Sequence, residues 1–207
     1  MIRISRRFQR FSPTDLFACL ACALALLNAP PIHAQDSIVH FDKADAKIDF
    51  SLGSSLHTVH GTFSLKNSSI HFDPANGKIS GFVAVDATSG ESGNNSRDSR
   101  MHREIIESAK FPEIVFTPTQ ITGAVAPDGT SKVNISGRFS LHGKDHDVTF
   151  PVEVVAGGQK LQIAFHYEIP YVEWGLKSPS NFFLKASDKV DVDIHATGRM
   201  ETASAAQ

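Results

Sequence analysis

The chain has 207 residues, of which 41% are hydrophobic and 20% are charged, and its formal net charge is −2. This composition is typical of one globular domain and excludes collagen, low-complexity and coiled-coil proteins. There are 15 phenylalanines but only one tryptophan and two tyrosines. Because phenylalanine carries a large apolar area and no polar group, this excess favours an apolar interior over polar recognition.

The N-terminal segment has the pattern of a secretory signal peptide. Four arginines within residues 3–10 precede the apolar stretch Leu16–Ala29, which is too short to span a membrane comfortably. A proline pair follows, and Ala34 supplies a small residue at the cleavage position. We therefore predict a signal peptide over residues 1–34 that is cleaved near Ala34, leaving a mature domain of residues 35–207.

Two alternatives for this segment stay open. It could remain uncleaved as an N-terminal membrane anchor. It could also be lipidated at Cys19, because Leu16–Cys19 loosely resembles a bacterial lipobox, although residues 11–15 are too polar for the apolar part of such a signal.

Cleavage would change the charge and the cysteine content. Four arginines and one aspartate lie in residues 1–34, so residues 35–207 carry 16 basic and 21 acidic side chains, a net charge of −5. Both cysteines also lie in the first segment, which excludes thiol chemistry and Cys-ligated zinc from the mature domain. An acidic domain without a basic block argues against nucleic-acid binding. No later stretch approaches 18 apolar residues, so we expect a mature form that is not embedded in a membrane.

Apolar residues recur at every second position throughout the mature domain. Val133, Ile135, Phe139 and Leu141 alternate with polar residues, and such one-sided alternation is typical of antiparallel strands with one buried face. Asn76-Gly77 between two such runs is a strong hairpin signal. The pattern predicts strands over residues 46–52, 57–65, 68–73, 78–87, 113–122, 132–142, 145–155, 160–170 and 188–197.

Two segments depart from this alternation. A polar loop over residues 89–96 leads into one short helix near residues 99–109, where Ser99 could cap the start and Phe111-Pro112 ends it. Such a helix between strands commonly covers a barrel opening. The stretch 170–185 carries four aromatic residues and predicts a second, apolar lid.

An all-β fold with about eight antiparallel strands must form a sandwich or close into a barrel. Closure removes the sheet edges, and a barrel of this size holds either its own side chains or one small ligand. The periodicity therefore leaves two interpretations open: a carrier of an apolar molecule, or a barrel whose interior is only a packed core.

Five short motifs stand out along the mature domain: Val59–Phe63 (VHGTF), Arg97-Asp98 with Met101, Phe111–Phe116 (FPEIVF), Ile135–Gly143 (ISGRFSLHG) and Glu173–Leu176 (EWGL). In these motifs and in their order, the chain resembles the YceI-like family. The resemblance covers residues 38–199. Met101 and Trp174 depart from the leucine and phenylalanine of the family pattern.

The resemblance implies a single eight-stranded antiparallel, lipocalin-like β-barrel exported to the bacterial periplasm. It further implies a binding protein that holds a polyisoprenoid or similar amphiphilic lipid for transport, storage or stress response, without catalytic machinery. We predict no cofactor and no metal. An exposed strand edge could support a homodimer, although nothing in the sequence requires one.

The predicted ligand-binding residues are aromatic side chains on the inward positions of the strands, with two more at the barrel mouth. They are Phe50, Phe63, Phe72, Phe116, Phe139, Phe150, Phe165 and Tyr167, with Trp174 and Phe182 at the mouth.

Polar candidates give weaker alternatives. A metal-binding protein or metal-dependent enzyme could use His142 and His146, which could meet across the Gly143 turn, but the sequence places no third ligand. Asp98 and His102 lie four residues apart on the expected helix and could form an acid–base pair. A structural role for Asp98 at the start of the helix is the stronger interpretation.

Overall fold

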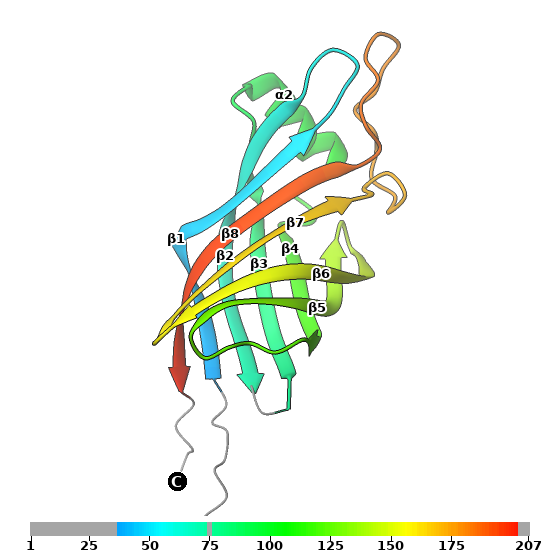
Figure 1. The fold of residues 1–207 in the computed structure, drawn as a ribbon. Coiled ribbons are helices and arrows are strands. Elements are labelled where there is room, and N and C mark those ends of the chain that lie inside the picture. Colours follow the sequence, from blue (N-terminus) through cyan, green and yellow to red (C-terminus); the bar gives the residue numbers. More distant parts are fainter. Residues whose placement is uncertain (1–36, 74–75, 203–207) are drawn as a thin grey trace, which may run out of the picture. The chain divides into compact units, whose positions relative to one another are not determined.

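The computed structural model describes residues 37–73 and 76–202, which form a closed, eight-stranded antiparallel barrel (Figure 1). The strands run in chain order and β8 pairs back onto β1, as predicted for an all-β fold. The strands are β1 Ser37–Leu52, β2 Val59–Asp73, β3 Lys78–Glu91, β4 Glu113–Thr122, β5 Gly129–Leu141, β6 Lys144–Gly157, β7 Lys160–Ile169 and β8 Val190–Thr202. The predicted signal peptide lies outside the described residues.

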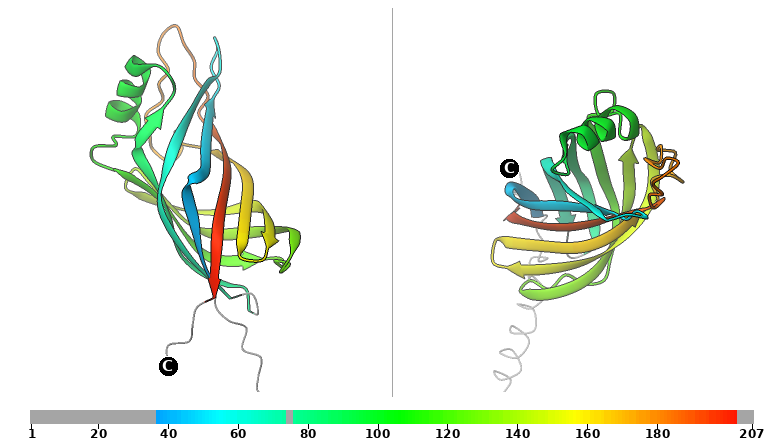
Figure 2. Two further views of the ribbon diagram at one scale, coloured as in Figure 1. Left: turned by 90° about the vertical axis from the view of Figure 1, so that its left-hand side faces the viewer. Right: turned by 90° about the horizontal axis from the view of Figure 1, so that it is seen from above.

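The up-and-down order of the strands gives the barrel two distinct ends. The β1–β2 loop, the helical segment after β3 and the β7–β8 loop lie at one end, which we call the helical end (Figure 1). We call the other end of the barrel the opposite end. The turn between β6 and β7, which contains Gly158, lies there, as do the start of β1 and the end of β8. Figure 2 shows the helical segment on the rim of the helical end.

Register irregularities explain two differences from the predicted strands. The segments expected over 57–65 and 68–73 form one strand, β2, because the pairing with β3 shifts between Leu65 and Asn67 and then continues. Similarly, β1 begins at Ser37 rather than at residue 46, and its pairing with β8 shifts between Phe41 and Ala46. A bulge bends a strand without ending it, so the break in alternation did not mark a strand end.

The helix begins earlier than expected. Helix α2 spans Asn95–Arg100, and a π-helical turn, η2, follows over Met101–Ile105. The prediction that Ser99 caps the helix was wrong, since the Asn94 side chain accepts a hydrogen bond from the backbone N–H of Arg97 at 3.0 Å. Asparagine is as strong an N-cap as serine, and the polar loop held several candidates.

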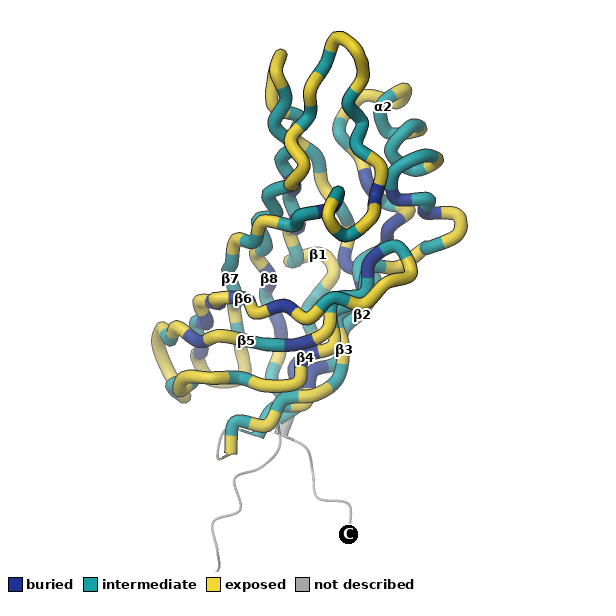
Figure 3. The backbone as a smooth tube through the Cα atoms, turned by 90° about the vertical axis from the view of Figure 1, so that its right-hand side faces the viewer, coloured by how far each residue is buried: buried dark blue, intermediate teal, exposed yellow. Residues whose placement is uncertain are grey.

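A cluster of buried residues lies on the inner face of β5 and β6. From Val148 to Val154 of β6, buried positions alternate with exposed ones, and this pattern can be followed in Figure 3. Phe150 lies at the centre, with its ring 4.9 Å from that of Phe116 and 5.0 Å from that of Phe165 (centroid to centroid). The buried cluster comprises Val133, Val148, Phe150, Val152 and Val154.

Glycines allow inward rings to lie directly against a neighbouring strand. A Cβ added to Gly61 would lie 2.3 Å from the Phe50 ring and 2.3 Å from the carbonyl oxygen of Glu91. Gly137 similarly lies under the Phe116 ring. A side chain at either position would displace a ring that faces the barrel interior.

We therefore expect Gly61→Ala to lower the free energy of unfolding by about 1–3 kcal/mol, the usual cost of overpacking. Urea denaturation would measure the change. Gly53→Ala is the matched control, because no atom of the described residues lies within 4 Å of its added Cβ. Equal stability of the two variants would contradict the proposed contact of Phe50 with Gly61.

Candidate functional site

A large apolar cavity runs through the barrel. Its volume is about 1100 Å³, which slightly exceeds the range of about 300–1000 Å³ that is usual for small-molecule pockets. Phe72 and Met200 line it near the opposite end, and Ser92 and Asn181 line it at the helical end. The cavity thus extends along most of the barrel and can accommodate an elongated molecule.

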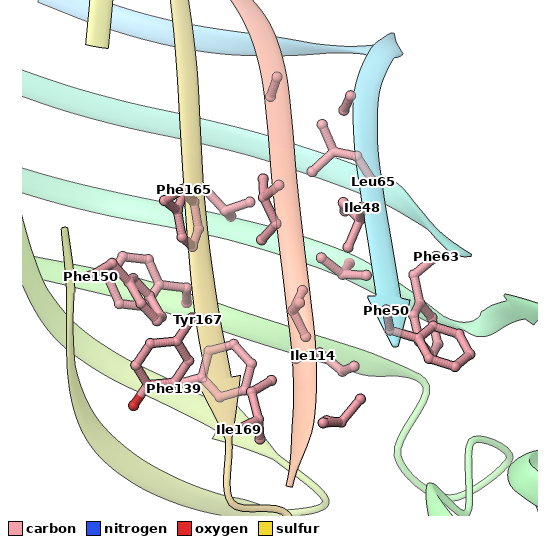
Figure 4. Close-up of a pocket in the computed structure, with 18 of the residues that line it drawn as sticks. Ile48, Phe50, Phe63, Leu65, Ile114, Phe139, Phe150, Phe165, Tyr167 and Ile169 are labelled. Atoms are coloured by element: carbon pink, nitrogen blue, oxygen red, sulfur yellow. The ribbon is translucent and has the colours of Figure 1, made fainter. Parts of the chain in front are cut away.

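Eight of the ten predicted site residues line this cavity. They are Phe50, Phe63, Phe72, Phe116, Phe139, Phe150, Phe165 and Tyr167. Figure 4 shows four labelled side chains of β5–β7 (Phe139, Phe150, Phe165 and Tyr167) across the cavity from Phe50 and Phe63. The ring centroids of Phe50 and Phe63 are 5.5 Å apart. The alternation in the sequence therefore located inward side chains correctly, while their contact with a ligand stays a prediction.

The two residues expected at the mouth do not line the cavity. Phe182 is 90% exposed and contacts Phe183, which is 85% exposed, at a ring distance of 5.1 Å. The expected apolar lid is thus apolar only in its first part, where Tyr171 is buried and donates a hydrogen bond from its hydroxyl to the carbonyl oxygen of Ser187. Period-two alternation does not extend into a loop, so it gave no guide to the direction of Phe182.

Trp174 packs at the end of the core cluster instead. Its ring stacks on His146 with 4.0 Å between centroids and lies 5.7 Å from Phe139. Burial lowers the pKa of His146, and the nearby Lys144 acts in the same direction. The Nε2 atom of His146 is buried and has no hydrogen-bond partner among the described residues, which also favours the neutral imidazole.

His146 and His166 should therefore titrate on opposite sides of the ordinary histidine pKa of 6.5. A hydrogen bond to Asp193 raises the pKa of His166. The stability that neutral His146 supports is complete above pH 6.5 and is lost as the pH falls through its folded pKa. The contribution of His166 is complete below pH 6.5 and is lost as the pH rises through its folded pKa.

An NMR titration of the histidine ring protons measures both pKa values. We expect the midpoint of His146 below 6.5 and that of His166 above it, and His166→Gln and His146→Gln variants would assign the signals. The reverse order of the two midpoints would contradict the burial of His146 against Trp174.

The helical segment contributes cavity residues that the alternation in the sequence does not predict. Arg97, Arg100, Met101 and Ile105 line the helical end of the cavity. No alternation marks these positions, and which side chains face the cavity depends on where the loop places the helix. The aliphatic residues of β8 were detectable, since Val190, Val192 and Ile194 alternate and also line the cavity.

The Arg97-Asp98 pair fastens the helical segment to the end of β3. The Arg97 guanidinium donates to the Ser92 hydroxyl and to the Ser92 carbonyl oxygen, each at 2.7 Å. Asp98 accepts hydrogen bonds from the backbone N–H and the hydroxyl of the same serine. Burial opposes ionisation of Asp98, but these hydrogen bonds outweigh it and hold the pKa of Asp98 below its usual value.

The acid–base pair considered for Asp98 and His102 does not form. The Nε2 atom of His102 lies 2.8 Å from the carbonyl oxygen of Gly90, to which it donates, and the Nδ1 atom lies 3.0 Å from the Ser108 hydroxyl. Both ring nitrogens therefore have structural partners. This arrangement ties η2 to β3 and leaves His102 without the hydrogen bond to Asp98 that general acid–base catalysis would need.

The histidines considered for metal binding also face different partners. The Nε2 atom of His142 lies 2.5 Å from the Glu107 carboxylate, whereas His146 stacks on Trp174. Within residues 37–73 and 76–202, no three His, Cys, Asp or Glu side chains are grouped so that they could hold a metal ion. In the same residues, no helix is both long enough and apolar enough to cross a bilayer.

Comparisons with known proteins agree with this architecture. A barrel from Burkholderia cenocepacia, BcnA, superposes with a TM-score of 0.63 at 20% identity, over 76% of this chain and 98% of that one. A Saccharophagus degradans domain described as polyisoprenoid-binding superposes with a TM-score of 0.60 at 16% identity, over 79% of this chain and 98% of that domain. At these identities the similarity shows the shared fold.

Sequence comparison identifies relatives as well. The UPF0312 protein VPA0850 of Vibrio parahaemolyticus is 31% identical over 147 residues, which are 67% of this chain and 74% of that protein. A UPF0312 protein of Pseudomonas fluorescens is 26% identical over 191 residues, covering 87% and 95% of the two chains. The YceI-like domain profile matches residues 40–198, nearly all of the barrel. The chain therefore belongs to the YceI-like domain family.

Proposed function

We propose that this protein is a binding protein that holds a long apolar or amphiphilic lipid, of polyisoprenoid type, inside its barrel. The observation that carries the proposal is the cavity of about 1100 Å³, whose lining is mainly aliphatic and aromatic. The Saccharophagus degradans domain described as polyisoprenoid-binding has the same fold, which supports the same class of ligand.

The energetics favour a chain-like ligand over a compact one. Removing one isoprene-sized unit from water contributes about 2–3 kcal/mol at about 25 cal/mol per Å² of apolar area. Ordering of a flexible ligand offsets part of this gain. Several units in succession can therefore bind tightly, and the length and width of the cavity set the specificity.

Titration with a fluorescent polyene fatty acid tests this proposal. We expect saturable, near-stoichiometric binding and competition by unlabelled polyprenols. Polyprenols longer than the cavity should gain little affinity with each further unit. The absence of saturable binding would contradict the proposal and favour a barrel that only forms a core.

We also propose that the protein is exported to the periplasm, with residues 1–34 removed. The arginines and the apolar stretch of this segment support export, and their function would be to direct the chain across the inner membrane. Cell fractionation followed by N-terminal sequencing tests the proposal. The expected product begins at or near Gln35, whereas an uncleaved or lipidated N-terminus would contradict it.

The proposed role is transport or storage rather than catalysis. Asp98 and His102 have the structural partners described above, and His142 and His146 face apart. Their arrangement supports neither acid–base catalysis nor a shared metal ion.

A further inference from the structure

Charged groups line only one end of the cavity. Among the described residues that line it, Arg97 and Arg100 are the only charged side chains, and no carboxylate is among them. Both lie at the helical end, beside the polar residues Ser92, Asn94 and Asn181. The opposite end is lined mainly by apolar residues such as Phe72, Ile79, Ile121, Val125 and Met200.

From this asymmetry we infer that the cavity selects amphiphiles with an anionic head group, a carboxylate or a phosphate monoester. The head group binds at Arg100 and Arg97, and the apolar chain extends toward the opposite end. This inference rests on the proposed lipid-binding function and adds to it the charge and the direction of the ligand.

Both arginines have guanidinium donors that no residue in 37–73 or 76–202 uses. A guanidinium has five N–H donors in a planar fork that matches carboxylate and phosphate oxygens. Arg97 uses two hydrogen bonds to anchor itself on Ser92. Arg100 uses one, from Nε to Glu104 at 3.2 Å, and its side chain is 43% exposed.

Glu104 is the nearby carboxylate that competes with a ligand for Arg100. It accepts a hydrogen bond from Arg103 at 3.0 Å as well, so its charge is shared between two arginines. These two hydrogen bonds hold the pKa of Glu104 below its usual value, which keeps the side chain ionised. Glu104 does not line the cavity, so its carboxylate weakens the binding of an anion at Arg100 without itself occupying the cavity.

The apolar part of the cavity reinforces the direction of binding. An ionised head group placed among Phe72 and Ile121 would lose its hydration without gaining a partner, which is unfavourable. At the helical end it keeps part of its hydration and gains charge-assisted hydrogen bonds. The reverse direction is therefore disfavoured.

Competition assays with three ligands that share one chain test the inference. Dodecanol, dodecanoate and dodecyl phosphate compete with the same fluorescent probe for the full chain, the two anions below their critical micelle concentrations and dodecanol below its solubility limit. We expect the two anions to bind about fivefold more tightly than the alcohol, or better, since charge-assisted hydrogen bonds to a half-exposed guanidinium are partly screened. This preference should shrink as salt is added, and the affinity of dodecanol should not.

Variants of the helical segment assign the preference to Arg100. Arg100→Gln should bring the anion-to-alcohol ratio close to one, and Glu104→Gln should raise the ratio by removing the competing carboxylate. Arg138→Gln removes the same charge from an exposed arginine that does not line the cavity, so the ratio should not change. If Arg100→Gln does not fold, the anion-to-alcohol ratio is measured for Arg100→Lys and Glu104→Gln instead. Both variants keep the positive charge at residue 100, so both should still prefer the anions.

The outcomes separate this inference from the proposed function. Equal affinity for dodecanol and both anions would overturn the inference and leave lipid binding intact. A preference for only one anion would identify the head group as carboxylate or phosphate and support the inference. Failure of all three ligands to displace the probe would overturn both.

Discussion

Replacing Phe150 by alanine is expected to lower the free energy of unfolding by about 3–5 kcal/mol, the usual cost of truncating a buried phenylalanine. Phe150 is 4% exposed, and its ring contacts four other aromatic rings. These neighbours are Phe116, Phe139, Phe165 and Tyr167. Because Phe150 borders an existing cavity, we expect the surrounding side chains not to fill the space that its ring leaves, so the loss of stability is not reduced by repacking.

Urea denaturation of the two proteins measures this loss. Phe182→Ala is the matched control, because the same truncation at a 90% exposed ring should change stability by less than about 0.5 kcal/mol. Similar losses in the two variants would show that Phe150 does not lie at the centre of the core.

Replacing Val83 by tryptophan is expected to weaken binding of a long-chain lipid by about tenfold or more, while the fold is retained. Val83 lies on β3 and lines the cavity, so its half-buried side chain faces empty volume rather than packed atoms. An indole ring can extend into that volume and exclude the ligand without overpacking the core. Probe titration and thermal unfolding of the same samples measure the two effects.

The neighbouring position supplies a matched control. Phe82 precedes Val83 on the same strand, is 38% exposed and does not line the cavity. Phe82→Trp should therefore leave probe affinity unchanged. Undiminished binding by Val83→Trp would show that the ligand occupies another part of the molecule.

Alternation in the sequence was sufficient to predict the barrel and most of its lining. Inward positions such as Phe139 and Phe165 follow from period two alone, because successive side chains of a strand face opposite sides. The strand boundaries were less predictable. A bulge such as the one between Phe41 and Ala46 interrupts the alternation while the strand continues.

The polar end of the cavity could not be predicted in the same way. Arg97 and Arg100 face the cavity because the hydrogen bonds of Ser92 to Arg97 and Asp98 fix the helical segment against β3. These contacts depend on the tertiary path of a loop, which no local period encodes. For Phe182 the prediction was wrong in the other direction. An aromatic residue in this loop suggested a lid over the cavity, but its side chain is exposed to solvent.

The family and the apolar cavity both favour binding of a lipid inside the barrel. Native mass spectrometry of the protein purified from its own compartment, before and after extraction with organic solvent, tests this claim most directly. We expect an excess mass that disappears on extraction and is recovered in the solvent as an amphiphile with an acidic head group. A single mass equal to that of the polypeptide before and after extraction, in a protein that also takes up no added lipid, would contradict it.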